Sequence, residues 1–348
     1  MLKLPAVLRS LLFTILLVHL GASSFGFTGD KDSLSNTYIK RYPDRFYIKP
    51  LLTIRSLELE LTHRITDQRV DYKPNGTRYA GLGIFFFDIG LEASLRLPEN
   101  SQMNPERFGR TRIFDFQANI YTKALGVDVN YQRYKGFFIR NPGEIFESWT
   151  GTDNFPQRRD LRLSNTQANI FYIFNHDTFS FRSAYSQADR QLRSKGSLLV
   201  FTSITQLSVS ADSSLVPSEI RDTFSEAGDF SDGRFTTLAF MPGYAHNFVY
   251  KTLYFNLSLA FGTGYQWEDY TLGDNKVEDA QFTMTSNLRS ALGYNGDKFF
   301  AGASLVFQNV QSTIDDIRVE SLTGNIKVFI GYRFKEKGFL KAKLFARK

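Results

Sequence analysis

The stretch Thr252–Gly264, TLYFNLSLAFGTG, decides the fold expected for this chain. Its odd positions from Leu253 to Phe261 are apolar, and the positions between them are mostly polar or small. A period of two places the apolar set on one face of a β-strand and the remainder on the other face. The same alternation returns at Phe282–Tyr294, Phe299–Phe307 and Ile326–Phe334. Strands of about ten residues with this repeat, separated by turns, are typical of a transmembrane β-barrel.

Composition agrees with a barrel and excludes several other classes of protein. The chain has 348 residues, 42% of them hydrophobic and 15% aromatic, with a mean hydropathy of −0.26. Beyond the N-terminus, no apolar run approaches the ~20 residues that a membrane-spanning helix needs. The absence of cysteine excludes disulfides and thiolate metal sites, and scattered charges with a net of +7 argue against nucleic-acid binding. A Phe-rich soluble β-sandwich is the alternative fold.

The N-terminus predicts export. Lys3 and Arg9 flank the start of a short apolar run, Leu11–Leu20, and small residues follow from Gly21 to Gly26. This order is typical of a cleaved signal peptide. We therefore expect a signal peptide at 1–26, a periplasmic lead-in at 27–44, an outer-membrane barrel at 45–334 and a basic C-terminal tail at 335–348. An added strand in the tail is the alternative.

Tracing the strand signals from Phe46 onward predicts an all-β fold, a single antiparallel barrel of about 12 strands, with 14 as the alternative. Apolar parity flips between Ile54 and Leu57, which predicts a β-bulge in one bent strand or else two short strands. The segment Phe179–Tyr185 is predicted to be a strand that pairs with Gln167–Phe174 across a tight turn. Residues 199–243 hold two strand candidates. Each spanning strand takes the chain to the opposite end of the barrel, and the predicted order of short and long connections allows only one of the two to span.

Several short motifs carry a family resemblance. They are Tyr72–Leu97 (YKPNGTRYAGLGIFFFDIGLEASLRL), Arg190–Ser197 (RQLRSKGS), Ala211–Pro217 (ADSSLVP) and Pro242–Tyr250 (PGYAHNFVY). The chain resembles, from about Tyr42 to Phe334, an uncharacterised family of outer-membrane β-barrel proteins of Bacteroidota that is catalogued as a domain of unknown function. The resemblance implies a barrel in the outer membrane of such a bacterium, and it implies no activity and no functional residue.

Charged residues opposite the apolar rows are the candidate lumen lining. They are Glu58, Glu92, Arg96, Asp115, Asp128, Arg182, Arg289, Lys327 and Arg333. Charges of both signs in a narrow interior can pair into a satisfied network, or they can line a selective channel. The leading hypothesis is a small channel or passive transporter for a polar or amphipathic solute in the cell outer membrane of a Gram-negative bacterium. Its expected partners are membrane lipid, the barrel-assembly machinery and a small polar solute, with no nucleic acid.

Two further functions remain open. A long loop at Gly136–Asp160 carries Trp149 and Phe155, which would be the contact surface if the protein is a non-transporting barrel that binds a partner. The third hypothesis is a hydrolase at the membrane rim. Neither Gly-x-Ser-x-Gly nor His-Glu-x-x-His occurs in the sequence. We therefore expect no catalytic residues, no cofactor and no metal site.

Overall fold

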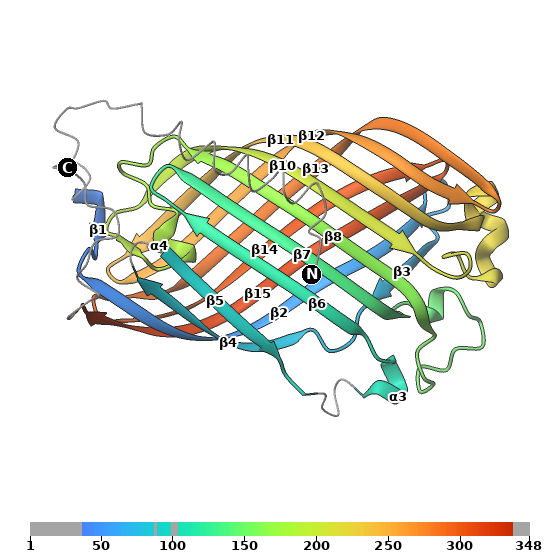
Figure 1. Cartoon of the computed structure of the whole chain (residues 1–348), viewed down its shortest axis with the longest axis horizontal. Helices are drawn as coiled ribbons and strands as arrows, with labels where there is room; N and C mark the ends of the chain where they lie inside the picture. Colours follow the sequence, from blue (N-terminus) through green and yellow to red (C-terminus); the bar gives the residue numbers. More distant parts are fainter. Residues whose placement is uncertain (1–36, 87–88, 99–103, 337–348) are drawn as a thin grey trace, which may run out of the picture.

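The fold is an antiparallel β-barrel, seen from the side in Figure 1. The computed structural model describes residues 37–86, 89–98 and 104–336. The predicted signal peptide and nearly all of the predicted basic tail lie outside these residues.

Ten of the described strands form a closed ring, because the last strand pairs with the first long one along its full length. All ladders in the ring are antiparallel. In sequence order the ring strands are β2 (Arg45–His63), β3 (Arg69–Lys73), β7 (Leu125–Ile139), β8 (Gln157–Ile173), β10 (Lys195–Ser210), β11 (Phe230–Tyr250), β12 (Leu253–Leu272), β13 (Asn275–Asn295), β14 (Phe299–Ile314) and β15 (Ile317–Lys335). The all-β antiparallel barrel is confirmed, but the closed ring does not have the predicted 12 strands.

Three more strands of the same sheet lie outside this ring. β4 (Arg78–Phe86) pairs with β2, β5 (Ile89–Arg96) pairs with β4, and β6 (Arg112–Tyr121) pairs with β7. β3 lies between β2 and β7 past the paired parts of β4 and β6. It pairs with β2 at Leu59–Thr62, and its Tyr72 and Lys73 pair with Ile139 and Phe138 of β7. The wall is therefore bridged by β3 at one end of the barrel, whereas β4, β5 and β6 occupy the space between β2 and β7 towards the other end.

The segment between β8 and β10 corrects one prediction. Phe179–Tyr185 is not a strand; it leads into the short helix α4 (Arg182–Tyr185), which is followed by β9 (Asp189–Gln191). β9 pairs with β1 (Ile39–Arg41) from the lead-in, and Figure 1 shows β1 at the end of the barrel where α4 lies. Because residues 174–194 add no spanning strand, the chain needs both β10 and β11 in the wall. The prediction that only one of them spans is wrong for this reason.

The parity flip in β2 is not a bulge. The register between β2 and β15 is constant from His63 opposite Ile317 to Arg45 opposite Lys335. The same alternation continues, but a different face becomes apolar: Leu52 is 58% exposed on the outside, whereas Leu59 is 1% exposed on the inside. The strand passes from surroundings that favour apolar residues outside to surroundings that favour them inside.

The barrel thus has two halves with opposite patterns. The terminus-side half, where β2 begins and β15 ends, exposes apolar residues outwards, among them Phe255, Phe261 and Val328. The far half buries apolar residues inwards. Its core is Leu57, Leu59, Leu61, Val70, Tyr72, Tyr134, Leu161, Leu163, Leu207, Val209, Phe235, Ile314, Ile317, Val319 and their neighbours. Within the described residues, no helix has the length and apolar character required to cross a membrane.

The remaining short helices lie at connections. α3 (Pro105–Phe108) precedes β6, η3 (Pro142–Glu144) follows β7, and η4 (Ser218–Asp229) precedes β11. Figure 1 shows α3 at the end of the barrel opposite β1 and α4. Long connections on this far side join β5 to β6, β7 to β8 and β10 to β11, whereas β12 is joined to β13 and β14 to β15 by tight turns.

Candidate functional site

The terminus-side end of the lumen is filled by the insert, residues 174–194. Phe179 and Phe181 are at most 1% exposed, and all of α4 is buried. The ring of Phe181 lies 4.9 Å from that of Phe171, an inward residue of β8, and 4.5 Å from that of Tyr185. Burying these aromatic rings is favourable in proportion to the apolar area removed from water. The insert is therefore packed into the barrel as a plug.

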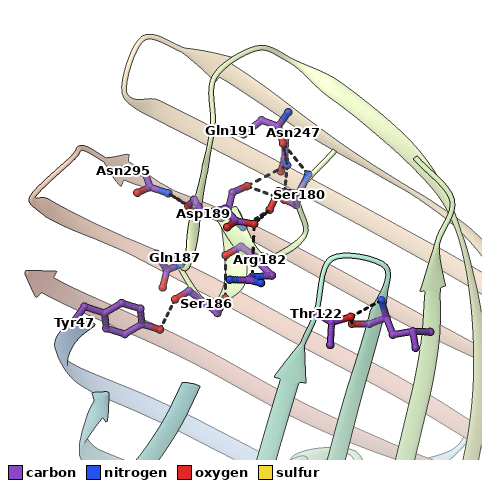
Figure 2. A network of polar contacts seen from close by, with 12 residues as sticks. Tyr47, Thr122, Ser180, Arg182, Ser186, Gln187, Asp189, Gln191, Asn247 and Asn295 are labelled. Atoms are coloured by element: carbon purple, nitrogen blue, oxygen red, sulfur yellow. Dashed lines mark hydrogen bonds and ion pairs between the residues drawn. The ribbon is translucent and has the colours of Figure 1, made fainter. Parts of the chain in front are cut away.

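A polar network fastens this plug to the wall (Figure 2). Ser180 Oγ donates to Asp189 at 2.8 Å, and Asn247 Nδ2 donates to the Ser180 carbonyl at 3.0 Å. Asn295 Nδ2 donates to the Ser183 and Asp189 carbonyls at 3.1 and 3.0 Å. Tyr47 from β2 donates to the Ser186 carbonyl. These bonds satisfy buried backbone carbonyls that the irregular insert would otherwise leave unpaired.

Arg333 closes the same end from β15. It is 3% exposed and donates to the Gly296 carbonyl at 2.6 Å, to Asn295 Oδ1 at 2.7 Å and to the Gln187 carbonyl of the insert. Its guanidinium lies 4.3 Å from the ring centre of Tyr42 in the lead-in. One side chain therefore joins the last strand, the insert and the lead-in.

Arg289 forms the centre of a buried polar layer at mid-barrel. It is 1% exposed, and its Nη2 lies 2.6 Å from Asp128 across the lumen. Its Nε donates to Asn287 at 2.7 Å, and Tyr121 OH donates to Asp128 at 2.8 Å. The guanidinium also lies 5.1 Å from the ring centre of Phe171. A buried pair with this many partners rigidifies the interior, and removing one partner would leave a charge unmatched.

Two further carboxylates in this layer are matched by cations. Glu92 from β5 lies between Lys49, at 2.7 Å, and Lys327. Asp115 from β6 lies 3.3 Å from Arg55 and accepts a hydrogen bond from Tyr134 at 2.8 Å. The lumen charges thus form pairs across strands.

A cavity of about 220 Å³ lies beside this network. Its polar wall contains Glu92, Asp128, Asn130, Gln167, Asn169, Arg289, Ser304, Gln308, Asn325 and Lys327. Another part of the lining is Phe116–Tyr121, six consecutive residues of β6. Alternate residues of a strand point to opposite faces, so a cavity that touches all six lies along the edge of β6.

That edge is unpaired. Among the described residues β6 pairs only with β7, and β5 pairs only with β4, so no ladder joins β5 to β6. Arg96 bounds the gap on the far side, where it donates to the Gly76 carbonyl at 2.8 Å and the Thr111 carbonyl at 3.0 Å. Backbone groups that face lipid without partners are costly. The cavity therefore borders the unpaired edge of β6.

The far end of the lumen is closed by apolar packing. Leu215 and Phe224, from the connection between β10 and β11, are 0% exposed within the far core. Tyr72 OH donates to the Leu215 carbonyl, and Arg158 Nη1 donates to the Ser214 carbonyl at 2.7 Å. Side chains and a folded connection therefore fill this end.

The structure brings most of the predicted lumen residues together. The residues that lie on the inward face of strands are Glu92, Arg96, Asp115, Asp128, Arg289, Lys327 and Arg333. Arg182 is on α4 rather than on a strand, 3.6 Å from Asp189. The placement of Glu58 in the lumen is wrong: it lies opposite the exposed Leu322 on the outer wall, 3.3 Å from Lys73. The apolar face of β2 has turned inwards at this level, so its polar face looks out.

Lys49 and Arg55 are site residues that the sequence analysis missed. They occupy the inward, odd-numbered positions of β2 and pair with Glu92 and Asp115. The signal was present, because they alternate with Ile48, Leu52 and Ile54. If the alternation of inward and outward residues is continued without a break along β2, both residues fall on the inward face.

Trp149 and Phe155 belong to an aromatic cluster on the far side. Their rings lie 5.1 Å apart, and Phe155 also stacks on Phe108 at 4.9 Å. Arg107 lies 5.5 Å from the ring centre of Phe155. Both predicted residues are half-buried in this cluster, so they are only partly available to a partner.

The neighbouring helix η3 is held by Glu144. This carboxylate accepts hydrogen bonds from Arg69 at 3.2 and 3.3 Å and from Asn141 at 3.0 Å. The bonds from Arg69, and then that from Asn141, lower the pKa of Glu144. Within the described part of the chain, no three His, Asp or Glu side chains are grouped so as to hold a metal ion.

Comparisons with known proteins identify a family and list solved structures to which the chain is distantly similar. A family model described as "Domain of unknown function (DUF4421)" matches residues 30–334. No curated protein matches the sequence. Among solved structures, the chain is similar to the outer membrane protease OmpT of Escherichia coli, with 8% identity and a TM-score of 0.41 over 85% of this chain and 98% of that one. It is also similar to the toluene transporter TodX of Pseudomonas putida, with 12% identity and a TM-score of 0.26 over 91% of this chain and 78% of that one. A third similar structure is the translocator domain of the autotransporter NalP of Neisseria meningitidis, with 8% identity and a TM-score of 0.29 over 95% of this chain and 100% of that one.

Proposed function

The chain belongs to the DUF4421 family, and we propose that it is an outer-membrane barrel that takes up or holds a small amphipathic solute through its side wall. The cavity beside the unpaired edge of β6 is the observation that carries this proposal. The outward apolar rows of the terminus-side half would lie in lipid, as the outer band of a membrane barrel does. The far half, with its apolar core inside, would project into water.

The orientation follows from the connections. The turns between β6 and β7, β11 and β12, and β13 and β14 are short and lie at the terminus-side end. Outer-membrane barrels keep short turns at the periplasmic side and long loops outside. The terminus-side end is therefore the periplasmic end in this proposal. The insert, although long, is packed inside the lumen, so it is not a long external loop.

Closure of both ends argues against a resting ion channel. The insert occupies one end and the far core occupies the other. A channel needs a continuous polar path whose sites an ion can enter and leave. The sequence predicted either a small channel or a passive transporter. We infer that a passive transporter for an amphipathic solute fits the closed lumen better than an open channel does.

The lining of the cavity defines the solute. One wall offers charged and amide groups such as Arg289, Lys327 and Gln308, and the other offers the edge of β6 with Phe116 and Ile120. A molecule with one polar end and one apolar end would satisfy both walls. The volume is below the roughly 300–1,000 Å³ of drug-sized sites, so a small molecule or a single alkyl chain with its polar end fits best.

Binding of spin-labelled lauric acid to the detergent-solubilised full-length chain tests this function. Ser304 lines the cavity, and Ser304→Trp should abolish binding by filling it. Ala303→Trp is the matched control, because the neighbouring residue lies opposite the exposed Val328 and points outwards. Equal binding by both variants and the wild type, or no binding by the wild type, would contradict the proposed cavity function.

A partner-binding barrel is the second candidate, and the cluster of Trp149, Phe155 and Arg107 favours it. Half-exposed aromatic residues next to arginine resemble the composition of binding hot spots. The proposal includes no catalytic role for these residues.

A further inference from the structure

Three basic residues form a row on the outer wall. Arg112 on β6 lies directly opposite Lys135 on β7, and Lys135 lies directly opposite Arg162 on β8. Neighbouring strands are only about 4.8 Å apart, and like charges directly opposite one another destabilise a sheet. Such a row needs a counter-charge, and the sheet does not place one in it.

More cations surround this row. Arg110 and Arg159 line a hollow of about 480 Å³ together with Arg112 and Lys135, and Arg133 is the next outward residue of β7. Among the described residues, the others that line the hollow are Pro105, Gly109 and Gln157, and none of these carries a carboxylate. We call Arg110, Arg112, Arg133, Lys135, Arg159 and Arg162 the basic face.

The nearest acid along β8 is paired elsewhere. Within the part of the chain that the structure describes, no residue of the basic face forms a salt bridge. Asp160, the nearest carboxylate along β8, pairs with Arg158 at 2.8 Å and accepts a hydrogen bond from the Asp212 N–H. Along the row itself, the next acid is Asp232, two strands beyond Arg162. The lumen cations Lys49, Arg55, Arg289 and Lys327, by contrast, have carboxylate partners at close range.

The backbone fixes the basic face in place. β7 has an irregularity at Gly136, whose φ of +90° few other residues adopt without strain. Thr111 Oγ1 donates to the Gly136 carbonyl at 2.7 Å, so the start of β6 is tied to β7 at the irregularity. This bond holds Arg110 and Arg112 beside Lys135.

The surface next to the basic face is aromatic. Two residues further along β6 from Arg112 is Phe114, 60% exposed, and then Phe116, 54% exposed, opposite Tyr131. Aromatic girdles mark the interface between hydrocarbon and headgroups in membrane barrels. Given the orientation in the proposed function, on which this step rests, the cations lie at the level of the outer-leaflet headgroups.

We propose that the basic face binds the phosphate-bearing headgroup of an outer-leaflet lipid. Phosphate oxygens match the planar fork of arginine, and several arginines converge on the hollow. The rings of Phe114 and Phe116 would contact the apolar part of the same lipid. A soluble phosphate would leave these rings without a partner, which is why the occupant is a lipid.

Native mass spectrometry of the detergent-solubilised full-length chain, titrated with dioleoyl phosphatidic acid, tests the site. The variant Arg112→Gln, Lys135→Gln, Arg162→Gln should bind the first phosphatidic acid at least tenfold more weakly than the wild type. The control is Arg64→Gln, Arg234→Gln, Lys251→Gln, which removes the same charge from three residues outside the basic face and should bind as the wild type does. Equal weakening in both variants would overturn the site, because it would reflect net charge alone.

Two further measurements distinguish a lipid site from a site for free anions and from a structural role of the row. Inorganic phosphate at millimolar concentration should not displace the lipid; displacement at equal affinity would indicate a site for free anions and overturn the lipid assignment. In lipid-free neutral detergent the row variant should unfold at the same or a higher temperature than the wild type, because like-charge repulsion is removed. A lower unfolding temperature would assign the row a structural role instead. Binding in detergent does not depend on orientation or on the cavity, so this result is separable from the test with Ser304→Trp.

Discussion

The two halves of β2 follow one rule with opposite results. From Ile48 to Ile54 the outward residues are apolar and exposed, whereas from Leu57 to Leu61 the inward residues are apolar and buried. β15 does the same, with Val328 exposed outside and Val319 buried inside. A period-two pattern states that two faces differ, and it does not state which face meets lipid. We propose that the reversal marks the level at which the barrel leaves the membrane.

The largest effect is expected when the buried ion pair between Arg289 and Asp128 loses one partner. Arg289→Met would leave Asp128 buried without its cation, and losing one partner of a buried pair costs about 3–5 kcal/mol. We expect a correspondingly lower unfolding free energy, measured by urea titration of heat-modifiable gel mobility. The double variant Arg289→Met, Asp128→Leu should recover much of the loss. If the single variant unfolds like the wild type, the interior network is not holding the barrel together.

The far half should respond to loss of apolar volume inside. Leu59→Ala empties part of a core in which Leu59 is 1% exposed, and such truncations cost about 2–5 kcal/mol. The matched control on the same strand is Leu52→Ala, whose side chain is 58% exposed on the outer face and should cost far less. The same urea titration compares them, and equal costs would remove the distinction between the halves.

The terminus-side half should respond to charge outside. Val328→Arg places a cation on the outward apolar face, which costs about 2–4 kcal/mol near the middle of a bilayer. The control Ser304→Arg puts the same residue into the cavity, where Glu92 and Asp128 also line the wall. Assembly into lipid vesicles is the measurement. Equal yields for the two variants would mean that the outer face is not in lipid.

The sequence predicted which strand residues face the lumen and which face outwards, but it did not predict the insert that fills the lumen. Alternation is local, so it places residues such as Val328 and Arg289 on opposite faces without knowledge of any partner strand. The insert was misjudged because Phe179, Phe181 and Tyr185 also fall on odd positions, although they pack against Phe171 instead of forming a strand. Packing of this kind depends on contacts between distant residues, and a local pattern does not record them.

The gap between β5 and β6 and the basic face were missed for a related reason. Arg112, Lys135 and Arg162 are far apart in the sequence and meet only through the register of β6, β7 and β8. The absence of a ladder at the edge of β6 likewise depends on where β3 joins β7. Register between strands fixes both features, and the composition of one strand does not reveal it.

The smallest effect concerns the lead-in at the terminus-side end of the barrel. Asp297 accepts hydrogen bonds from Lys40 at 2.8 Å and Tyr42 at 3.1 Å, and the bond from Lys40 is the main cause of its lowered pKa. A carboxylate with a lowered folded-state pKa stabilises the attachment above its unfolded pKa of about 3.9, and this contribution disappears as the pH falls through the folded value. Hydrogen exchange of residues 38–44 should therefore stay constant, after correction for intrinsic rates, from pH 7 to about 4 and quicken as the pH is lowered further. In Asp297→Asn the exchange should already be faster at pH 7 and change little with pH. Identical profiles would exclude this contact as the attachment.

The reversal along β2 can be measured directly with single spin labels at the outward positions Ile48, Leu52, Ile54, Glu58 and Glu60 of the protein in lipid vesicles. The native chain has no cysteine, so each label can be placed on one introduced thiol. The account predicts that labels at 48, 52 and 54 are relaxed mainly by oxygen, which dissolves in lipid, and labels at 58 and 60 mainly by a water-soluble nickel complex. Oxygen-dominated relaxation at all five positions, or nickel-dominated relaxation at 52, would contradict the claim that β2 leaves the membrane where its apolar face turns inwards.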